Sequence, residues 1–259
     1  MGALCFAKRC GISTGSHLAA KRSEERAQRE RFARQRIMRS TVRNLEFKFK
    51  SGGVMDERIK RTMENLRHNR MKPYFVESRE ELYDTIRGLI KEDRLITAGG
   101  SMSLKDSGVT ELLMKEFGDV YLDRSKGKDK AEVDEIMRKA FVSDTFFASS
   151  NAITEDGELY NVDGNGNRVS AMIYGPKQVI IVAGVNKIVK DLAEAKQRVE
   201  KIAAPKNTVR LNCDTPCTKT GECMHCHSPA RICCSYVTLA HQRVPDRIKV
   251  IILNENLGY

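Results

Sequence analysis

The sequence lacks tryptophan altogether, and aromatic residues make up only 6% of its 259 positions. It also lacks any apolar run approaching the roughly 18–20 residues that a membrane-spanning helix needs. The short apolar patch near Leu4 is followed by charge rather than by the small-residue cleavage site of a secretory signal. Hydrophobic residues still make up 41% of the chain, enough for one large domain or two small ones. These features predict a cytoplasmic protein without a membrane span.

The net charge of +11 is distributed unevenly along the chain. Residues 1–54 hold 13 of the 45 Lys and Arg residues and 4 of the 34 Asp and Glu residues. Residues 55–259 therefore hold 32 basic and 30 acidic residues and are close to neutral. A domain that binds a polyanion normally carries its positive charge on the folded surface. The distribution argues against nucleic acid as a partner.

Three interpretations compete for the basic segment 1–54. It is a nucleic-acid or membrane-surface arm, an Arg-rich transit peptide, or a translation artefact. Ser51 to Met55 can be encoded by TCA-GGA-GGT-GTN-ATG, which contains AGGAGGT, a bacterial ribosome-binding sequence. We therefore expect translation to start at Met55 and residues 1–54 to be a disordered or non-native extension. The intact mass of the native protein tests this expectation.

From residue 55 onward, the hydrophobic spacing predicts alternating helices and strands. Ser78 followed by Glu81 is a capping-box signature for the start of one helix. The predicted helices are 56–68, 78–91, 101–117, 130–141 and 189–203, and the predicted strands are 74–76, 95–98, 119–122, 145–148, 179–182 and 250–253. Segments 158–162 and 169–174 flank a turn at 163–168 and predict an antiparallel hairpin. The fold class is therefore α/β, a mostly parallel sheet with helices on both faces and an inserted hairpin.

Several polar loops follow apolar strands, which is where α/β sheets place their ligands. Glycines in the first loop let the backbone approach a ligand, although any strand-to-helix connection can need glycine. Hydroxyl, amide and basic side chains in the other loops suit a small carboxylate or phosphate. The candidate ligand-binding residues are Gly99, Gly100, Ser101, Ser150, Asn151, Thr154, Asp163, Asn165, Asn167, Arg168, Asn186 and Lys187.

Glu155 is the candidate catalytic residue, as acid, base or nucleophile. A simpler interpretation is that Glu155-Asp156-Gly157 forms the turn that starts the hairpin.

The cysteines form the strongest local pattern of the sequence. Six of the eight lie in the segment 213–234, spaced C-x3-C-x5-C-x2-C-x6-C-C and interleaved with turn residues. Thiolates that converge on one ion suit zinc or an iron–sulfur cluster. The predicted ligands are Cys213, Cys217, Cys223, Cys226 and Cys233. The alternative is a set of buried or redox-active thiols without a metal.

Several motifs in order resemble the LUD domain, the lactate-utilisation protein family. They are Gly99-Gly100-Ser101-Met102, Ser149 to Gly157, Asn161 to Arg168, Gly175-Pro176 and Gly184-Val185-Asn186-Lys187. The resemblance implies a fold like that of the sugar-phosphate isomerase and CoA-transferase superfamily. It also implies a role in oxidising L-lactate to pyruvate alongside iron–sulfur partner subunits, in a bacterial cytoplasm.

Two functions follow as hypotheses. The first is an enzyme or enzyme subunit that binds a small anionic ligand between the polar loops. The second is a metal-binding or iron–sulfur electron-transfer or assembly protein that acts through the cysteine segment 213–234. The sequence leaves the oligomeric state open.

Overall fold

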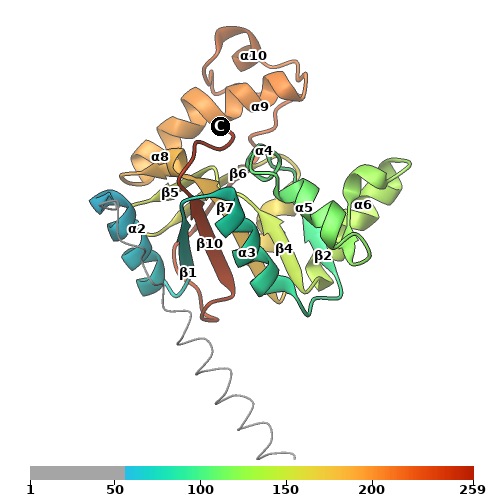
Figure 1. The fold of residues 1–259 in the computed structure, drawn as a ribbon. Coiled ribbons are helices and arrows are strands. Elements are labelled where there is room, and N and C mark those ends of the chain that lie inside the picture. The colour runs from blue at the N-terminus through green and yellow to red at the C-terminus, as the bar shows by residue number, and fades with distance from the viewer. Residues whose placement is uncertain (1–55) are drawn as a thin grey trace, which may run out of the picture. The chain divides into compact units, whose positions relative to one another are not determined.

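A sheet of six parallel strands forms the centre of this computed structural model, which describes residues 56–259 (Figure 1). The expectations for the basic segment 1–54 lie outside these residues. The strand order is β1-β10-β7-β4-β2-β3, and every neighbouring pair is parallel. The strands are β1 (Lys72–Val76), β10 (Ile248–Leu253), β7 (Gln178–Gly184), β4 (Thr145–Ala148), β2 (Ile96–Ala98) and β3 (Tyr121–Leu122). The predicted α/β class is confirmed.

Helices cover both faces of this sheet because its central strands are apolar on both sides. Phe147 and Ile180 belong to one core, which packs against α3, α4 and α5. Phe146 and Val179 point the other way, into a core shared with α2 and α7. The helices are α2 (Glu57–His68), α3 (Arg79–Ile90), α4 (Met102–Asp106), α5 (Val109–Glu116), α6 (Lys130–Lys139), α7 (Asn167–Ile173), α8 (Leu192–Arg198), α9 (Ala204–Arg210) and α10 (Pro216–Thr220), with short turns η1 (Arg124–Lys126), η2 (Ala140–Val142) and η3 (Val185–Lys187).

The start of α3 follows its sequence signature. The backbone N–H of Glu81 donates to the side chain of Ser78 at 3.2 Å, and the Glu81 carboxylate accepts from the N–H of Glu77 at 3.0 Å. Replacing such a cap by alanine typically costs about 1 kcal/mol. The helix buries Leu82, Ile86 and Ile90 at helical spacing, as the hydrophobic pattern predicts.

A second, mixed sheet contains the antiparallel hairpin, but not between the predicted strands. Its order is β8 (Ile188–Val189), β5 (Ala152–Thr154), β6 (Leu159–Asp163) and β9 (Ser235–Leu239), and β5 pairs antiparallel with β6. The prediction of a strand at 169–174 was wrong, because this segment lies in α7. Asp163 explains the difference: its carboxylate accepts from the N–H groups of Arg168 and Val169 at 3.0 and 3.2 Å and so caps the helix.

The helix predicted at 189–203 also differs from the prediction, since it begins later and continues past Pro205. It starts at α8, passes through the π-helical turn η4 (Val199–Ala203) and continues as α9 to Arg210. Proline lacks an N–H and normally breaks a helix interior, but it is tolerated in a first helical turn. Pro205 lies in the first turn of α9, directly after η4, and so occupies a position that tolerates proline.

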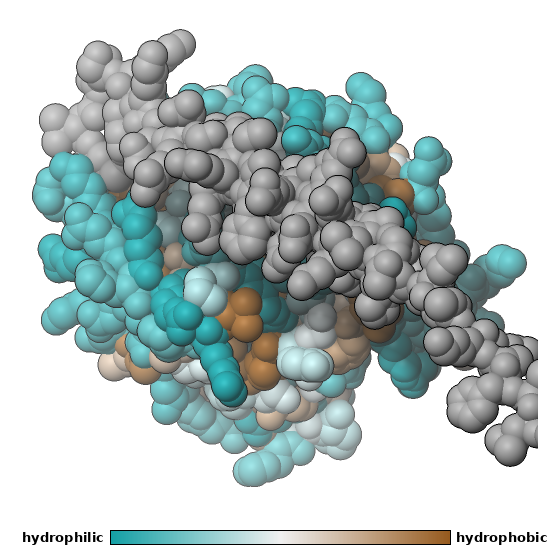
Figure 2. Space-filling model, turned by 90° about the horizontal axis from the view of Figure 1, so that it is seen from below, coloured by the Kyte–Doolittle hydropathy of each residue, from teal (hydrophilic) through white to brown (hydrophobic). Residues whose placement is uncertain are grey.

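No helix among residues 56–259 is long and apolar enough to cross a membrane. Seen from below, the visible surface is mostly hydrophilic, with a small apolar area between polar side chains (Figure 2). The exposed apolar residues of the described chain include Val142, Ile173, Tyr174 and Val244.

Candidate functional site

A cavity of about 120 Å³ lies at the carboxyl ends of the central parallel strands. Gly100 to Ser103 line it from the connection after β2, and Ser149 to Asn151 line it from the connection after β4. After β2 the chain leads to β3 at the sheet edge, whereas after β4 it leads to β7 on the opposite side. In open α/β sheets, ligands bind where neighbouring connections diverge in this way. The cavity thus lies at the position where open α/β sheets generally bind ligands.

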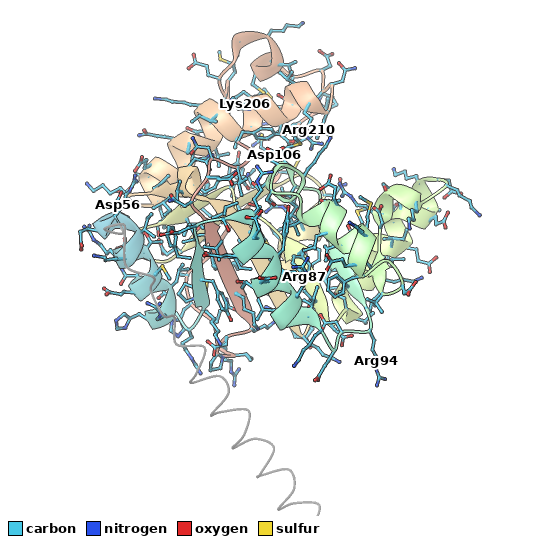
Figure 3. All side chains as sticks on the ribbon, in the orientation of Figure 1. Asp56, Arg87, Arg94, Asp106, Lys206 and Arg210 are labelled. Carbon is cyan, nitrogen blue, oxygen red and sulfur yellow. The ribbon has the colours of Figure 1, made fainter. Side chains whose placement is uncertain are left out.

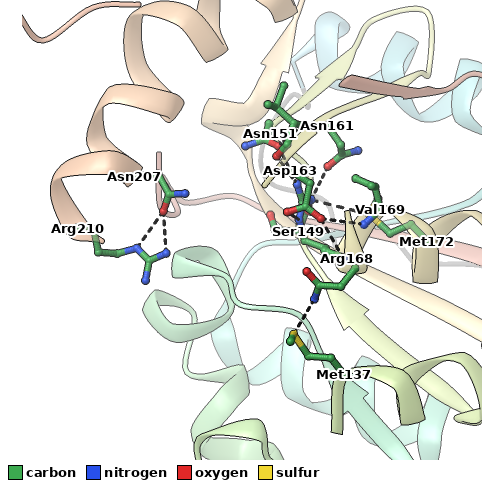
Figure 4. Close-up of polar contacts among 12 residues, drawn as sticks. Met137, Ser149, Asn151, Asn161, Asp163, Arg168, Val169, Met172, Asn207 and Arg210 are labelled. Atoms are coloured by element: carbon green, nitrogen blue, oxygen red, sulfur yellow. Dashed lines mark hydrogen bonds and ion pairs between the residues drawn. The ribbon is translucent and has the colours of Figure 1, made fainter. Parts of the chain in front are cut away.

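Arg168 holds one wall of the cavity together (Figure 4). Its guanidinium donates to the main-chain oxygens of Ser149 and Val162, both at 2.9 Å. It also donates to the side-chain oxygens of Asn161 at 2.6 Å and Asn151 at 3.1 Å. Burial lowers the pKa of Arg168 below its ordinary value, and the charge of Asp163 partly offsets this. The arginine thus fixes the connection after β4 against β6.

Gly99 makes room for this arginine. A Cβ atom at Gly99 would lie 3.2 Å from Cγ and 3.3 Å from Cδ of Arg168, and 3.2 Å from Phe146. Such contacts are tighter than side chains normally accept in a packed interior. The absence of a side chain at Gly99 therefore lets Arg168 pack closely against the backbone. From the sequence, the glycine was expected to let the backbone approach a ligand.

Lys187 is the second buried cation of the cavity wall, with 3% of its surface exposed. Burial, together with the positive charges of Arg198 and Arg168, lowers its pKa to about 7, while Asp106 opposes the shift. Its amine donates a hydrogen bond to the main-chain oxygen of Tyr259. Arg198 in turn donates to the main-chain oxygens of Asn186 at 3.2 Å and Asn151 at 2.9 Å. Two buried basic side chains, Arg168 and Lys187, therefore form part of the cavity wall.

Tyr259 and α9 form the opposite wall. The Tyr259 hydroxyl accepts from Nε of Arg210 at 2.8 Å and donates to Asn207 at 2.9 Å. Figure 3 shows Arg210 on α9 above Asp106 on α4. Among the described residues that line the cavity, Arg168, Lys187 and Arg210 are basic and Asp163 alone is acidic. The charge balance favours an anionic ligand.

The structure brings many of the predicted ligand-binding residues into this one cavity. Its lining includes Gly100, Ser101, Ser150, Asn151, Asp163, Arg168 and Lys187. Asn186 lies just behind the wall and bonds the backbone of Leu257 through its side chain. Asn167 contacts Met137 beside a smaller cavity, Asn165 lies exposed in the turn before α7, and Thr154 bonds within its own turn. The larger cavity is therefore not lined by five of the predicted residues, which are Gly99, Thr154, Asn165, Asn167 and Asn186.

Glu155, the candidate catalytic residue, lies outside the cavity. Its carboxylate accepts from Arg58 at 2.7 Å and from Arg61 at 2.9 Å, both on α2. Gly157, two residues later, has φ +78°, and a Cβ there would lie 2.4 Å from the backbone of Asn65. The structure thus shows Glu155 in the turn between β5 and β6, docked on α2.

The thiols of the cysteine segment do not converge on one point. No group of three or more Cys, His, Asp or Glu side chains among residues 56–259 is arranged to hold a metal ion. Cys217 is buried, with its sulfur 3.2 Å from the Thr215 hydroxyl and 3.5 Å from that of Thr208. The arrangement does not fit the closed tetrahedral geometry of a structural zinc site. The zinc or iron–sulfur centre stays a prediction, which metal analysis after anaerobic purification tests.

Cys233 nevertheless lines the ligand cavity, together with Ile232. The N–H of Cys234 donates to the main-chain oxygen of Asp163 at 3.0 Å, and β9 continues from there as the partner of β6. The segment 213–234 is thus attached to the cavity wall and is not a separate module.

The sequence reading missed Arg198, Asn207, Arg210 and Tyr259. The first three lie in a helix whose extent was underestimated, and their polar character alone resembles a solvated helix surface. Asn207 and Arg210, three positions apart, share one face of a regular helix, whereas Arg198, nine positions before Asn207, falls on the opposite side, so the spacing does not indicate a common polar face for all three. Tyr259 carries no local signal.

The sequence profile of the LUD domain matches residues 59–253, about three quarters of the chain. The chain belongs to the LUD domain family. The matched range includes the polar loops of the cavity and the cysteine segment, but not Tyr259.

A solved structure with a similar fold is that of a DUF162 family protein from Deinococcus radiodurans. It shares 14% sequence identity with this LUD domain, covers 78% of this chain and 100% of its own, and gives a TM-score of 0.46. No curated protein matches the chain.

Proposed function

We propose that this LUD domain protein binds a small carboxylate or phosphorylated ligand in the cavity bounded by Arg168, Lys187 and Arg210. The observation that carries the proposal is the charge of the cavity. Its three basic side chains outnumber its single acidic side chain, Asp163, whose carboxylate accepts hydrogen bonds from the first turn of α7. A ligand carboxylate or phosphate would supply the missing negative charge in a site of reduced dielectric.

The remaining polar groups of the cavity suit the same ligand. The side chains of Ser101, Ser103 and Asn207 line it beside the cationic residues. Hydroxyl and amide groups can donate to carboxylate or phosphate oxygens, and bonds to a charged acceptor are stronger than neutral ones.

The size of the cavity favours a small acid. A cavity of roughly 150 Å³ accommodates a molecule the size of benzene, and this one measures about 120 Å³. A three-carbon acid such as lactate or pyruvate has a similar number of heavy atoms. For a sugar phosphate or a CoA ester, only the anionic end would fit inside.

We further propose that the protein contributes to L-lactate oxidation, with iron–sulfur partner subunits supplying electron transfer. Family membership and the size and charge of the cavity support this role. Lactate-dependent dye reduction, measured with and without the partner subunits, tests it. Lactate oxidation that is unchanged when this chain is omitted would count against the role.

A thermal-shift screen tests the binding proposal itself. L-lactate, pyruvate, inorganic phosphate, a sugar phosphate and a CoA ester would be compared at the same concentration. A ligand present at 100 times its dissociation constant should stabilise the protein by about 2.7 kcal/mol. Lys187→Met should lose the shift, whereas Lys190→Met, three residues away and exposed, should retain it. Absence of a shift with every anion would contradict the proposal.

A further inference from the structure

Tyr259 is a hydrogen-bond partner of two of the three basic side chains that line the cavity. Its main-chain oxygen accepts from the amine of Lys187, and its hydroxyl accepts from Nε of Arg210 at 2.8 Å. The third basic side chain, Arg168, donates to oxygens of the protein itself. An anionic ligand would therefore enter a site whose basic groups already have partners, and two of the three share the same partner.

Leu257 anchors the chain just before this tyrosine. Its side chain is completely buried. Its N–H donates to the side-chain oxygen of Asn186 at 3.0 Å, and its main-chain oxygen accepts from the side-chain nitrogen of Asn186 at 3.3 Å. Gly258 and Tyr259 follow this anchor and are partly exposed. We call these two residues the strap 258–259.

The strap passes close to α4 and holds to it through a single backbone hydrogen bond. The N–H of Gly258 donates to the carboxylate of Asp106 at 3.0 Å. Gly258 has φ +55°, and a Cβ atom there would lie 2.8 Å from Oγ of Ser103, which lines the cavity. With one glycine and one half-buried tyrosine, the strap has little buried apolar surface to hold it. Segments of this kind open at a low free-energy cost.

We propose that the strap 258–259 is an autoinhibitory contact, and that an anionic ligand binds by displacing Tyr259 from Lys187 and Arg210. This inference rests on the proposed function, since the ligand uses the same basic side chains. In the closed form, the main-chain oxygen of Tyr259 takes the place of a ligand oxygen at Lys187, and its hydroxyl takes the place of a second one at Arg210. A carboxylate or phosphate has several charged oxygens and can replace both, because charged acceptors form the stronger hydrogen bonds.

The strap also limits the size of the ligand. With Tyr259 in place the cavity measures about 120 Å³, and displacement adds the space of the tyrosine ring. A whole sugar phosphate would then fit, and not only its anionic end. A site that is open in a fraction of the molecules binds its ligand more weakly by that fraction. A strap that is open in about one molecule in ten therefore weakens binding about tenfold.

Calorimetry on the native chain and on a chain shortened to end at Leu257 tests this account. The probes are inorganic phosphate, L-lactate and glucose 6-phosphate. We expect the shortened chain to bind phosphate and L-lactate about tenfold more tightly than the native chain, and glucose 6-phosphate to gain more than either. Equal or weaker binding by a folded shortened chain would overturn the strap.

Hydrogen exchange on the native chain, followed by NMR, needs no variant. Saturating phosphate should speed exchange of the Gly258 N–H by up to about tenfold, because its bond to Asp106 is lost with the strap. The N–H of Leu257 keeps its bond to Asn186 and is the internal control. Phosphate binding with unchanged or slower exchange at Gly258 would overturn the strap and leave the anion site standing.

Two variants of Asp106, which is exposed, test the strap if the shortened chain does not fold. Asp106→Ala removes both the acceptor of the Gly258 N–H and a negative charge near Lys187. Asp106→Asn removes the charge and keeps an acceptor oxygen. Tighter phosphate binding by Asp106→Ala than by Asp106→Asn would support the strap, and equal binding by the two would contradict it.

The same measurements separate the strap from the proposed function. Binding to the shortened chain alone would support both. If none of the three probes bound to the native chain, the shortened chain or Asp106→Ala, the anion site itself would be overturned, and the strap with it.

Discussion

The amine of Lys187 donates a hydrogen bond to the main-chain oxygen of Tyr259, which is 72 positions away in the sequence. The same tyrosine bonds Arg210 and Asn207 on α9 through its hydroxyl. Tyr259 thus links Lys187, the buried basic residue, to Arg210, the exposed one on α9.

Replacing Tyr259 by alanine should widen the cavity. The ring and both hydroxyl bonds are lost, while the main-chain oxygen that faces Lys187 remains. We expect longer oxo acids to gain affinity relative to pyruvate by several-fold, and a stability loss of about 1 kcal/mol from the lost hydrogen bonds. Competition calorimetry with a chain-length series measures the ratio. An unchanged preference would show that Tyr259 does not limit the cavity.

Arg168→Met should destabilise the fold strongly. The substitution removes the guanidinium donor from the oxygens of Ser149, Val162 and Asn161 inside the protein, while the Asn151 side-chain oxygen keeps the N–H of Val162 as a donor. Each buried unsatisfied acceptor costs about 1–3 kcal/mol, so a loss of about 3 kcal/mol or more is expected in urea unfolding.

Arg87→Met is the matched control for that substitution. Arg87 pairs with Asp84 and Glu116 at the surface, where ion pairs contribute little. A similar loss in both variants would contradict the structural role assigned to Arg168.

The lowered pKa of Lys187 predicts how the free energy of unfolding depends on pH. Its ordinary value is 10.5, which applies to the unfolded chain, and its folded value is about 7. Between these values the unfolded chain binds more protons at this residue, so its contribution raises the free energy of unfolding as pH rises. The loss of stability that comes from burying the charged Lys187 amine is fully present below about pH 7 and absent above about pH 10.5.

Comparison of the native chain with Lys187→Met isolates this contribution. The free energy of unfolding of the native chain, minus that of Lys187→Met, should increase as the pH rises from about 7 to 10.5. Arg198, Arg168, Asp106 and the Tyr259 main chain face the amine and are unchanged in the variant. A pH-independent difference would mean that Lys187 keeps an ordinary pKa.

Glu155→Gln separates the catalytic and structural interpretations of Glu155. The variant should weaken the ion pairs with Arg58 and Arg61 and lose about 1 kcal/mol or less, because both arginines are substantially exposed. Ligand binding should stay at the native level. If the variant lost lactate-dependent dye reduction without losing stability, the catalytic role predicted for Glu155 from the sequence would be supported.

The sequence predicted the parts of the fold that depend on local patterns. The Ser78 cap with Glu81 and the continuous apolar run of β7 are complete signals within a few residues. The segment 169–174 was misread because its β-branched and aromatic residues suit a strand, and the deciding contact comes from Asp163, outside the segment. Local propensity gives way to such capping and tertiary contacts.

The candidate site was predicted in part for the same reason. Lys187 follows the parallel strand β7, where a ligand is expected at the strand end, whereas Arg168 follows the antiparallel strand β6 and was selected from the polar turn at 163–168. Arg210 reaches the cavity through a helix that continues past Pro205, and Tyr259 reaches it from the last described residues. Neither a π-helical turn nor a distant contact leaves a periodic signal in the sequence.

The most direct test of the account is calorimetric titration of pyruvate and L-lactate into the native chain, Lys187→Met and Lys190→Met. The account predicts that the native chain and Lys190→Met bind equally well, and that Lys187→Met binds at least about tenfold more weakly, or about 1.4 kcal/mol. Equal affinity in all three proteins, or no binding to the native chain, would contradict it.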